Sequence, residues 1–209
     1  MSNFSYEIGS DNIAIIKWDV PDKKFNVLTL EGISEIENIL EKIFENNNLK
    51  GVIISSNKDD FSAGMDLNVL AHLQDQSKNK EEIFQFVMRA HQFLRKIELG
   101  GIDPKTKKGG IPFVWACNGL SAGIATEIGL ACHYRIAADK KNTKIGLPEI
   151  LVGLFPGAGG ATRVSRMLGL MSSAPILMEG RMFSAQKAKA IGLIDKVSNP
   201  LDLINEAKN

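Results

Sequence analysis

The stretch that decides the fold is NGLSAGIATE, residues 118–127, a glycine-containing turn that leads into a short apolar helix carrying Glu127. A second glutamate, Glu149, ends the segment IGLPE, residues 145–149, just before a glycine-rich turn at residues 153–160. Both carboxylates stand among apolar residues, where an unpaired charge is costly to bury. A carboxyl group in such surroundings tends to have a raised pKa, which suits proton transfer near neutral pH.

The residues alone leave two interpretations of these glutamates open. A glutamate in a short apolar helix needs either a partner or a function, and a buried salt bridge from Glu127 to Arg135 would supply the partner. Alternatively, the two carboxyl groups work as a catalytic pair. Two glutamates in similar settings favour the pair modestly.

Working outward from residues 118–127, strands alternate with helices. This alternation predicts an α/β fold with parallel strands and crossover helices, and the lack of an interdomain linker or a clear sequence repeat predicts one domain over residues 1–209. On the helices, apolar spacing places Phe84, Val164 and Met167 on inward faces. The strands are expected at residues 12–18, 51–55, 111–117, 134–138 and 193–197, and helices at about 81–97 and 122–131, after the caps Thr29 and Ser184, and after the turn at 157–160.

Composition excludes several classes of protein. A net charge of +1 gives no bulk electrostatic reason to expect nucleic acid or an anionic membrane as a partner. No apolar stretch approaches the roughly 20 residues that span a bilayer. Cys117 and Cys132 lie in apolar runs, which predicts buried free thiols in a reducing compartment. Together with a start that lacks a signal peptide, this predicts a cytoplasmic protein.

Three further motifs give weaker indications of function. The turn GAGG, residues 157–160, is neither a Walker A loop nor a dinucleotide-binding fingerprint, but its amides could position an anion or a carbonyl group. In FSAGMDL, residues 61–67, either Asp66 simply caps a helix or the turn aims amides at a substrate oxygen. Arg163 and Arg166 are expected on a solvated or salt-bridged helix face. The histidines lack metal-ligand spacing.

At these motifs the chain resembles the enoyl-CoA hydratase/isomerase (crotonase) superfamily over almost its whole length. The resemblance rests on FNVLT at 25–29, FSAGMDL at 61–67, residues 118–139 and residues 147–169. The last two, in this order and spacing, are a specific signature. More narrowly, ACHYRIA at 131–137 and LFPGAGG at 154–160 are similar to the hydratase part of multifunctional fatty-acid β-oxidation proteins.

The resemblance implies a spiral of repeated ββα units and assembly into a homo-trimer or larger oligomer. It assigns the Met65 and Ile124 N–H groups to an oxyanion hole for a thioester carbonyl, and Glu127 and Glu149 to the two catalytic positions. It also implies a set of residues that bind the substrate: Ser62, Ala63, Gly64, Asp66, Leu67, Asn68, Gly123, Pro156 and Gly157.

The implied reaction is reversible syn addition of water to a trans-2-enoyl-CoA in fatty-acid β-oxidation. Coenzyme A enters as part of the substrate, and neither a separate cofactor nor a metal is expected. Two alternatives remain: a 3,2-enoyl-CoA isomerase, which needs one working glutamate, and a non-catalytic protein that binds CoA thioesters or serves as an assembly subunit.

The chain departs from the family pattern at three places. Ile124 stands where the family has glycine, and a β-branched residue tolerates positive φ badly. Met65 replaces a small residue. The family continues with a further helical segment, so we expect this chain to be a truncated form or part of a longer multifunctional protein, with weakened activity as one consequence.

Overall fold

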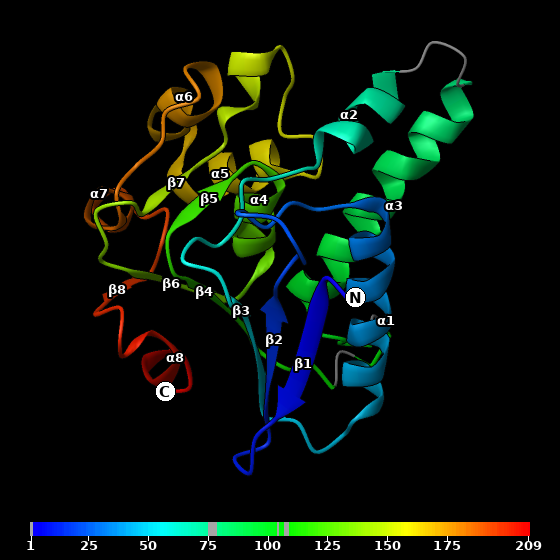
Figure 1. Ribbon diagram of the computed structural model, residues 1–209, viewed down its shortest axis with the longest axis vertical. Coiled ribbons are helices and arrows are strands. Elements are labelled where there is room, and N and C mark those ends of the chain that lie inside the picture. Colours follow the sequence, from blue (N-terminus) through cyan, green and yellow to red (C-terminus); the bar gives the residue numbers. More distant parts are fainter. Residues whose placement is uncertain (1, 75–78, 104, 107–108) are drawn as a thin grey trace.

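A six-stranded sheet runs through the centre of the molecule (Figure 1). The computed structural model describes residues 2–74, 79–103, 105–106 and 109–209. The strand order is β1-β2-β3-β4-β6-β8, with β1 antiparallel to β2 and every other neighbouring pair parallel. The prediction of a parallel α/β sheet is therefore confirmed. The strands are β1 Phe4–Ile8, β2 Ile13–Trp18, β3 Gly51–Ser56, β4 Phe113–Cys117, β6 Tyr134–Ala138 and β8 Lys196–Ser198.

Helices cover both faces of this sheet (Figure 1). α1 and α3 lie on one face, and the short α8 lies on the other, against β4 and β6. Thr29 begins α1 as expected, because its hydroxyl accepts the Gly32 N–H at 3.0 Å. The helices are α1 Leu30–Glu45, α2 Leu67–Gln74, α3 Lys80–Leu99, α4 Ile124–Ala131, the 3₁₀ helix η1 Pro148–Val152, α5 Gly160–Leu168, α6 Leu170–Met178, α7 Ala185–Ala190 and α8 Leu203–Ala207.

A second row of parallel pairings reveals the repeated ββα units. β5 Leu120–Ala122 pairs with β7 Lys144–Gly146, and single bridges join Ser62 to Ser121 and Leu28 to Met65. Each strand of the large sheet from β2 to β6 is thus followed by a short extended segment in this second row and then by a helix. The spiral that the family resemblance implied is present, although its second strands are too short to show periodicity in the sequence.

Buried Asn26 ties the two rows together. Its side chain is fully buried; the amide nitrogen donates to Trp18 O, Ser56 Oγ and Phe61 O, while Oδ1 accepts the Val20 N–H at 2.9 Å. Its backbone carbonyl accepts the Ala63 N–H at 2.9 Å. The side chain therefore satisfies groups from β2, β3 and the loop that leads to Met65.

Several local expectations need correction. Val164 is fully buried, but Met167 and Phe84 are exposed, because their helices present these positions to no other described element. The strands expected from 111 and 193 begin instead at Phe113 and Lys196. β1, β5, β7 and α6 were not anticipated. The sequence also predicts a solvated basic loop at residues 105–108, of which residues 107 and 108 lie outside the described residues. The side chain of His72, for which a structural or surface role is expected, lies outside them as well.

Candidate functional site

The candidate site lies where the second-row strands end. Met65 follows the Ser62 bridge, Gly123 follows β5, and Glu149 follows β7. Because these segments are parallel, their carboxyl ends fall on one edge, which is where α/β folds place their ligand sites. Gly64 approaches β5 so closely that a Cβ there would lie 3.0 Å from Ala122 O. The spiral thus brings together residues that are far apart in sequence.

The two amides of the expected oxyanion hole are free of backbone partners. Leu28 accepts from Asp66 N at 3.0 Å and donates to Gly64 O at 2.8 Å, so the intervening Met65 N–H points away from Leu28, towards the β5 side. Ile124 is the first residue of α4, where a helical N–H has no acceptor in its own helix. Among the described residues, neither N–H makes a hydrogen bond.

Ile124 does not adopt the strained backbone expected for it. The positive φ, +57°, belongs to Gly123, and Ile124 already has helical geometry with its side chain in the core. A Cβ on Gly123 would come within 3.4 Å of Glu149 Oε1. The glycine that the turn requires is therefore present one residue earlier, beside the carboxylate.

Glu127 is held by two backbone amides. Its Oε1 accepts the Ala158 N–H at 3.0 Å and the Gly160 N–H at 2.7 Å, and the residue is only 2% exposed. The alternative salt bridge to Arg135 is wrong, since Arg135 pairs with Asp195 at 2.7 Å. Burial raises the pKa of Glu127 to about 7, opposed by the Gly160 amide and assisted by the negative charge of Glu149.

Glu149 has an unsatisfied oxygen. It lies in the first turn of η1, and its Oε2 is buried without a hydrogen-bond partner among the described residues. Burial raises the pKa of this carboxyl group as well. A buried polar atom without a partner among the protein groups is unusual in a native protein, so this oxygen is available to bind a substrate or a water molecule.

The turn at 157–160 binds the Glu127 carboxylate, whereas the sequence suggested that its amides could position an anion or a carbonyl group. Its Ala158 and Gly160 amides are occupied by Glu127 and so are not free to bind an anion. A Cβ on Gly160 would lie 2.7 Å from Glu127 Cγ, so the glycine permits this close approach. The sequence showed the turn and the glutamate, but nothing in it paired them across 31 residues.

The remaining expected substrate residues divide into buried and exposed groups. Ser62 is fully buried and hydrogen-bonded to Asn26 O and Gly64 N. Asp66 accepts the Asn68 N–H at 2.9 Å at the start of α2 and pairs with Lys23, which favours the capping interpretation; the pKa of its carboxyl group is lowered chiefly by Lys23. Ala63, Leu67 and Asn68 are exposed near the Met65 amide, Pro156 is buried, and Gly157 is half-buried.

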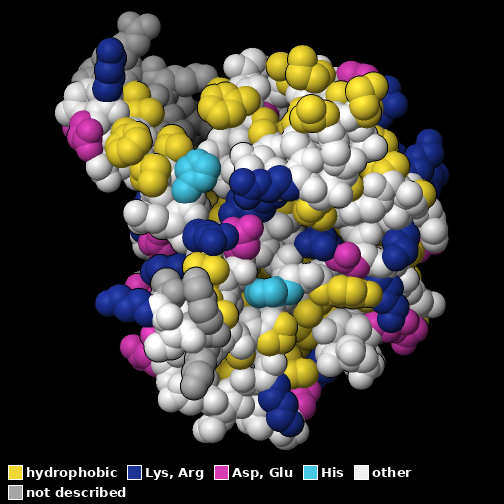
Figure 2. All heavy atoms as spheres, turned by 180° about the vertical axis from the view of Figure 1, so that it is seen from behind, with side chains coloured by type: hydrophobic (Ala, Val, Ile, Leu, Met, Phe, Trp, Pro, Cys, Tyr) yellow, Lys and Arg dark blue, Asp and Glu magenta, His cyan; other side chains and the backbone are white. Residues whose placement is uncertain are grey.

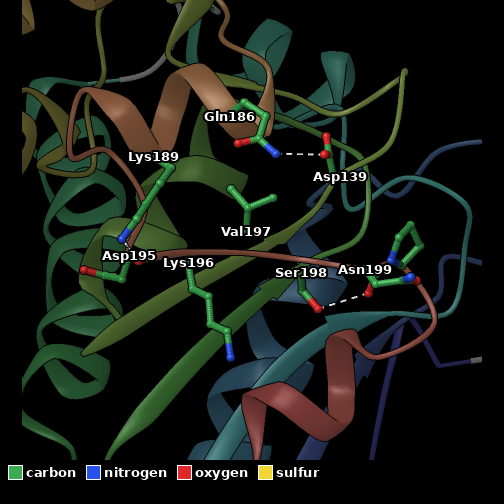
Figure 3. A pocket seen from close by; sticks show the side chains of 9 residues that line it. Asp139, Gln186, Lys189, Asp195, Lys196, Val197, Ser198 and Asn199 are labelled. Carbon is green, nitrogen blue, oxygen red and sulfur yellow. Dashed lines mark hydrogen bonds between the residues drawn. The ribbon is translucent and has the colours of Figure 1, made fainter.

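A hollow between α7 and β8 contains none of these residues (Figure 3). Gln186 donates to Asp139 at 2.8 Å, and the Lys189 ammonium donates to Asp195 O. Its polar groups largely satisfy one another, so we do not assign it to the site.

Other expectations concern the chain as a whole. Cys117 and Cys132 are buried free thiols, as predicted, and burial raises the pKa of each to about 12. In the described part of the chain, no cluster of three or more His, Cys, Asp or Glu residues could hold a metal ion. No helix among the same residues is long and apolar enough to cross a bilayer.

The raised pKa of Glu127 predicts a pH-dependent cost in stability. Between its ordinary value of 4.5 and about 7, the unfolded chain releases this proton while the folded protein keeps it, so stability falls as pH rises through this window. Glu127→Gln removes the titration. In urea unfolding, the free energy of unfolding of the variant minus that of wild type should increase from pH 5 to pH 8, by on the order of 3 kcal/mol. Exposed Glu179→Gln should show no such gain, and an equal difference at both pH values for Glu127→Gln would contradict the buried titration.

Comparison with known proteins places the chain in a family. The family model described as Enoyl-CoA hydratase/isomerase matches residues 9–209. An enoyl-CoA hydratase structure from Bacillus anthracis has 30% identity and a TM-score of 0.83, with 99% of this chain and 74% of that chain covered. An enoyl-CoA hydratase structure from Geobacillus kaustophilus HTA426 has 26% identity and a TM-score of 0.85, with 100% and 72% covered.

The fold extends to more distant proteins. DspI from Pseudomonas aeruginosa shares the fold at 22% identity, with a TM-score of 0.81 over 100% of this chain and 72% of that chain. The family match covers nearly the whole sequence and agrees with the ββα spiral. The chain therefore belongs to the enoyl-CoA hydratase/isomerase (crotonase) family.

Proposed function

We propose that this chain catalyses the reversible syn addition of water to a trans-2-enoyl-CoA thioester, as a hydro-lyase of fatty-acid β-oxidation acting in the cytoplasm. The observation that carries the proposal is the pair of carboxyl groups: Glu127, buried and hydrogen-bonded through one oxygen, and Glu149, whose buried Oε2 has no partner among the described residues. Both lie near the turn at Gly123, after which the Ile124 amide is free. The whole of residues 1–209 is taken to act as one unit.

In the proposed reaction, the Met65 and Ile124 amides bind the thioester oxygen. Negative charge develops there as water adds, and one preorganised donor of this kind is typically worth about 2.7–4 kcal/mol in the transition state. Ser62, Ala63, Gly64, Asp66, Leu67, Asn68, Gly123, Pro156 and Gly157 are proposed to surround the substrate, Ser62 and Asp66 by fixing the backbone that carries the Met65 amide.

Glu127 and Glu149 are proposed to handle the water and its protons. One carboxylate takes a proton from water as its oxygen bonds to the β-carbon, and a carboxyl proton passes to the α-carbon, so the atoms of one water are added. Two neighbouring carboxyl groups with raised pKa values share a proton readily near neutral pH, which provides an acid and a base together. No cofactor is proposed, because coenzyme A is part of the substrate.

The test is to incubate the protein with crotonyl-CoA and follow the absorbance of its conjugated thioester. We expect saturable loss of absorbance. Saturable binding without any loss would contradict the hydratase proposal and support a non-catalytic CoA-thioester protein. Conversion of a 3-enoyl-CoA to its 2-enoyl isomer, without hydration, would support the isomerase instead.

We further propose that an exposed apolar surface joins copies of this chain into a trimer or larger oligomer, or packs against more of a longer multifunctional chain. Hydrophobic side chains gather along one edge in Figure 2, at the end where α6 lies in Figure 1. Met171 is 88% exposed and Phe155 76%. Apolar patches of this kind mark interfaces. The surface consists of Ile150, Leu151, Val152, Phe155, Leu170, Met171 and Met178.

Light scattering after size exclusion tests the self-association. Wild type should elute as an oligomer, and Met171→Lys should shift it towards the monomer mass, because a charge buried in an apolar interface is costly. Leu201→Lys, at an equally exposed position away from this surface, is the matched control and should leave the mass unchanged. A monomeric wild type would contradict the oligomer.

A further inference from the structure

Ala158 connects Glu127 to a second side chain. Its N–H donates to Glu127 Oε1 at 3.0 Å, and its carbonyl oxygen accepts from Arg163 Nη1 at 3.1 Å. One residue thus links the two side chains, through its backbone N–H on one side and its carbonyl oxygen on the other. Gly159 lies between them with φ of +96°, and a Cβ there would come within 2.6 Å of Arg163 Nη1. The guanidinium group therefore packs directly on the turn.

Of the two settings expected for Arg163, a solvated or a salt-bridged helix face, the salt-bridged one is correct. Its side chain is only 12% exposed, and Nη2 donates to Glu98 Oε2 at 3.3 Å. Glu98 comes from α3 and is also held by Arg95 at 2.6 Å. A buried guanidinium needs such a partner to offset its loss of water. Glu98 of α3 thereby fixes the Arg163 guanidinium, which in turn donates to the carbonyl of Ala158.

We propose that Arg163 is a positioning residue which, through the backbone of residues 158–160, fixes Oε1 of Glu127 and leaves Oε2 turned to the reactant. A planar guanidinium suits this task, because its fork of donors can reach the carbonyl and the carboxylate together. The catalytic part of this inference rests on the proposed function. The structural part does not, because the hydrogen bonds from Ala158 and Gly160 to Glu127 do not depend on substrate.

The positioning has a measurable electrostatic consequence. The Ala158 and Gly160 amides and the positive charge of Arg163 all lower the pKa of Glu127, against the larger effect of burial. Loosening the turn and removing that charge should therefore raise the pKa further. A role confined to packing would change stability but not this pKa.

The experiment titrates Glu127 by carbon NMR of labelled glutamate side chains, with Glu127→Gln to assign the signal. Arg163→Gln should raise the pKa of Glu127 by about one unit. Arg163→Lys keeps the charge but cannot reach both partners with one fork, so a smaller upward shift is expected. Arg166→Gln, one turn further along α5 and exposed, is the control and should leave the pKa at the wild-type value.

Hydration kinetics supply the second readout. Arg163→Gln should lower kcat about tenfold or more with little change in KM, because the misplaced carboxylate still permits binding. If wild type does not hydrate crotonyl-CoA but Arg163→Lys, which keeps the charge, still raises the pKa of Glu127, the proposed function fails and the positioning stands. If the pKa of Glu127 is unchanged in whichever Arg163 variants fold, the positioning is overturned, whatever the kinetics show.

Discussion

Replacing Glu149 with glutamine is expected to lower kcat for crotonyl-CoA hydration about a thousandfold, since positioned acid–base groups typically contribute 10²–10⁴-fold. Glutamine has nearly the same shape as glutamate and is compatible with the η1 turn, but its amide can neither accept nor donate the proton that the reaction transfers. KM should change little, because the Met65 and Ile124 amides that are proposed to bind the thioester remain. Steady-state absorbance measurements on the purified variant check this result.

The matched control is Glu179→Gln, which changes an exposed glutamate whose side chain pairs with Arg181. It should retain the wild-type rate. Glu127→Gln should resemble Glu149→Gln in its loss of hydration. If Glu149→Gln kept more than about a tenth of the wild-type kcat, the two-carboxylate mechanism would be excluded, because the lost proton transfer should cost at least a hundredfold.

Replacing Asn26 with alanine is expected to destabilise the fold by about 4 kcal/mol. The change removes four hydrogen bonds at a fully buried side chain and leaves the Val20 N–H and the Phe61 carbonyl without partners. Each buried group left unsatisfied costs roughly 1–3 kcal/mol, and the vacated volume adds a cavity cost. Urea unfolding of the variant measures the difference.

Asn142→Ala provides the comparison, because Asn142 makes one exposed hydrogen bond, to Asp60 at 2.8 Å. It should change the free energy of unfolding by less than about 0.5 kcal/mol. A loss of similar size in both variants would show that Asn26 does not join the two rows of strands as described. Asn26→Asp is a harsher test of the same bonds, since a carboxylate cannot donate to the Trp18 and Phe61 carbonyls.

Much of the fold could be predicted because its local signals are strong. Thr29 and Ser184 begin helices as their side chains indicate, and the β-branched strand at 51–56 is buried as its composition predicts. The three-residue strands β5 and β7 could not be predicted, because so short a segment has no recognisable period. Helical spacing also misplaced Met167: it reports an apolar stripe but not whether another element covers it.

The sequence points to the two glutamates of the candidate site but not to their contacts. The two glutamates stood out because each lies in an apolar setting. Their partners did not, since Ala158 and Gly160 reach Glu127 only through the tertiary fold. The strain expected at Ile124 was misplaced by one residue. The turn needs positive φ at Gly123, directly before Ile124.

The central claim is that Glu127, Glu149 and the two amides add water to an enoyl thioester. Mass spectrometry after incubation with crotonyl-CoA in heavy-oxygen water tests this most directly. Wild type should yield a product heavier than the substrate by one labelled water, and neither Glu127→Gln nor Glu149→Gln should yield it at a comparable rate. Recovery of unchanged crotonyl-CoA from wild-type protein that demonstrably binds it would contradict the account.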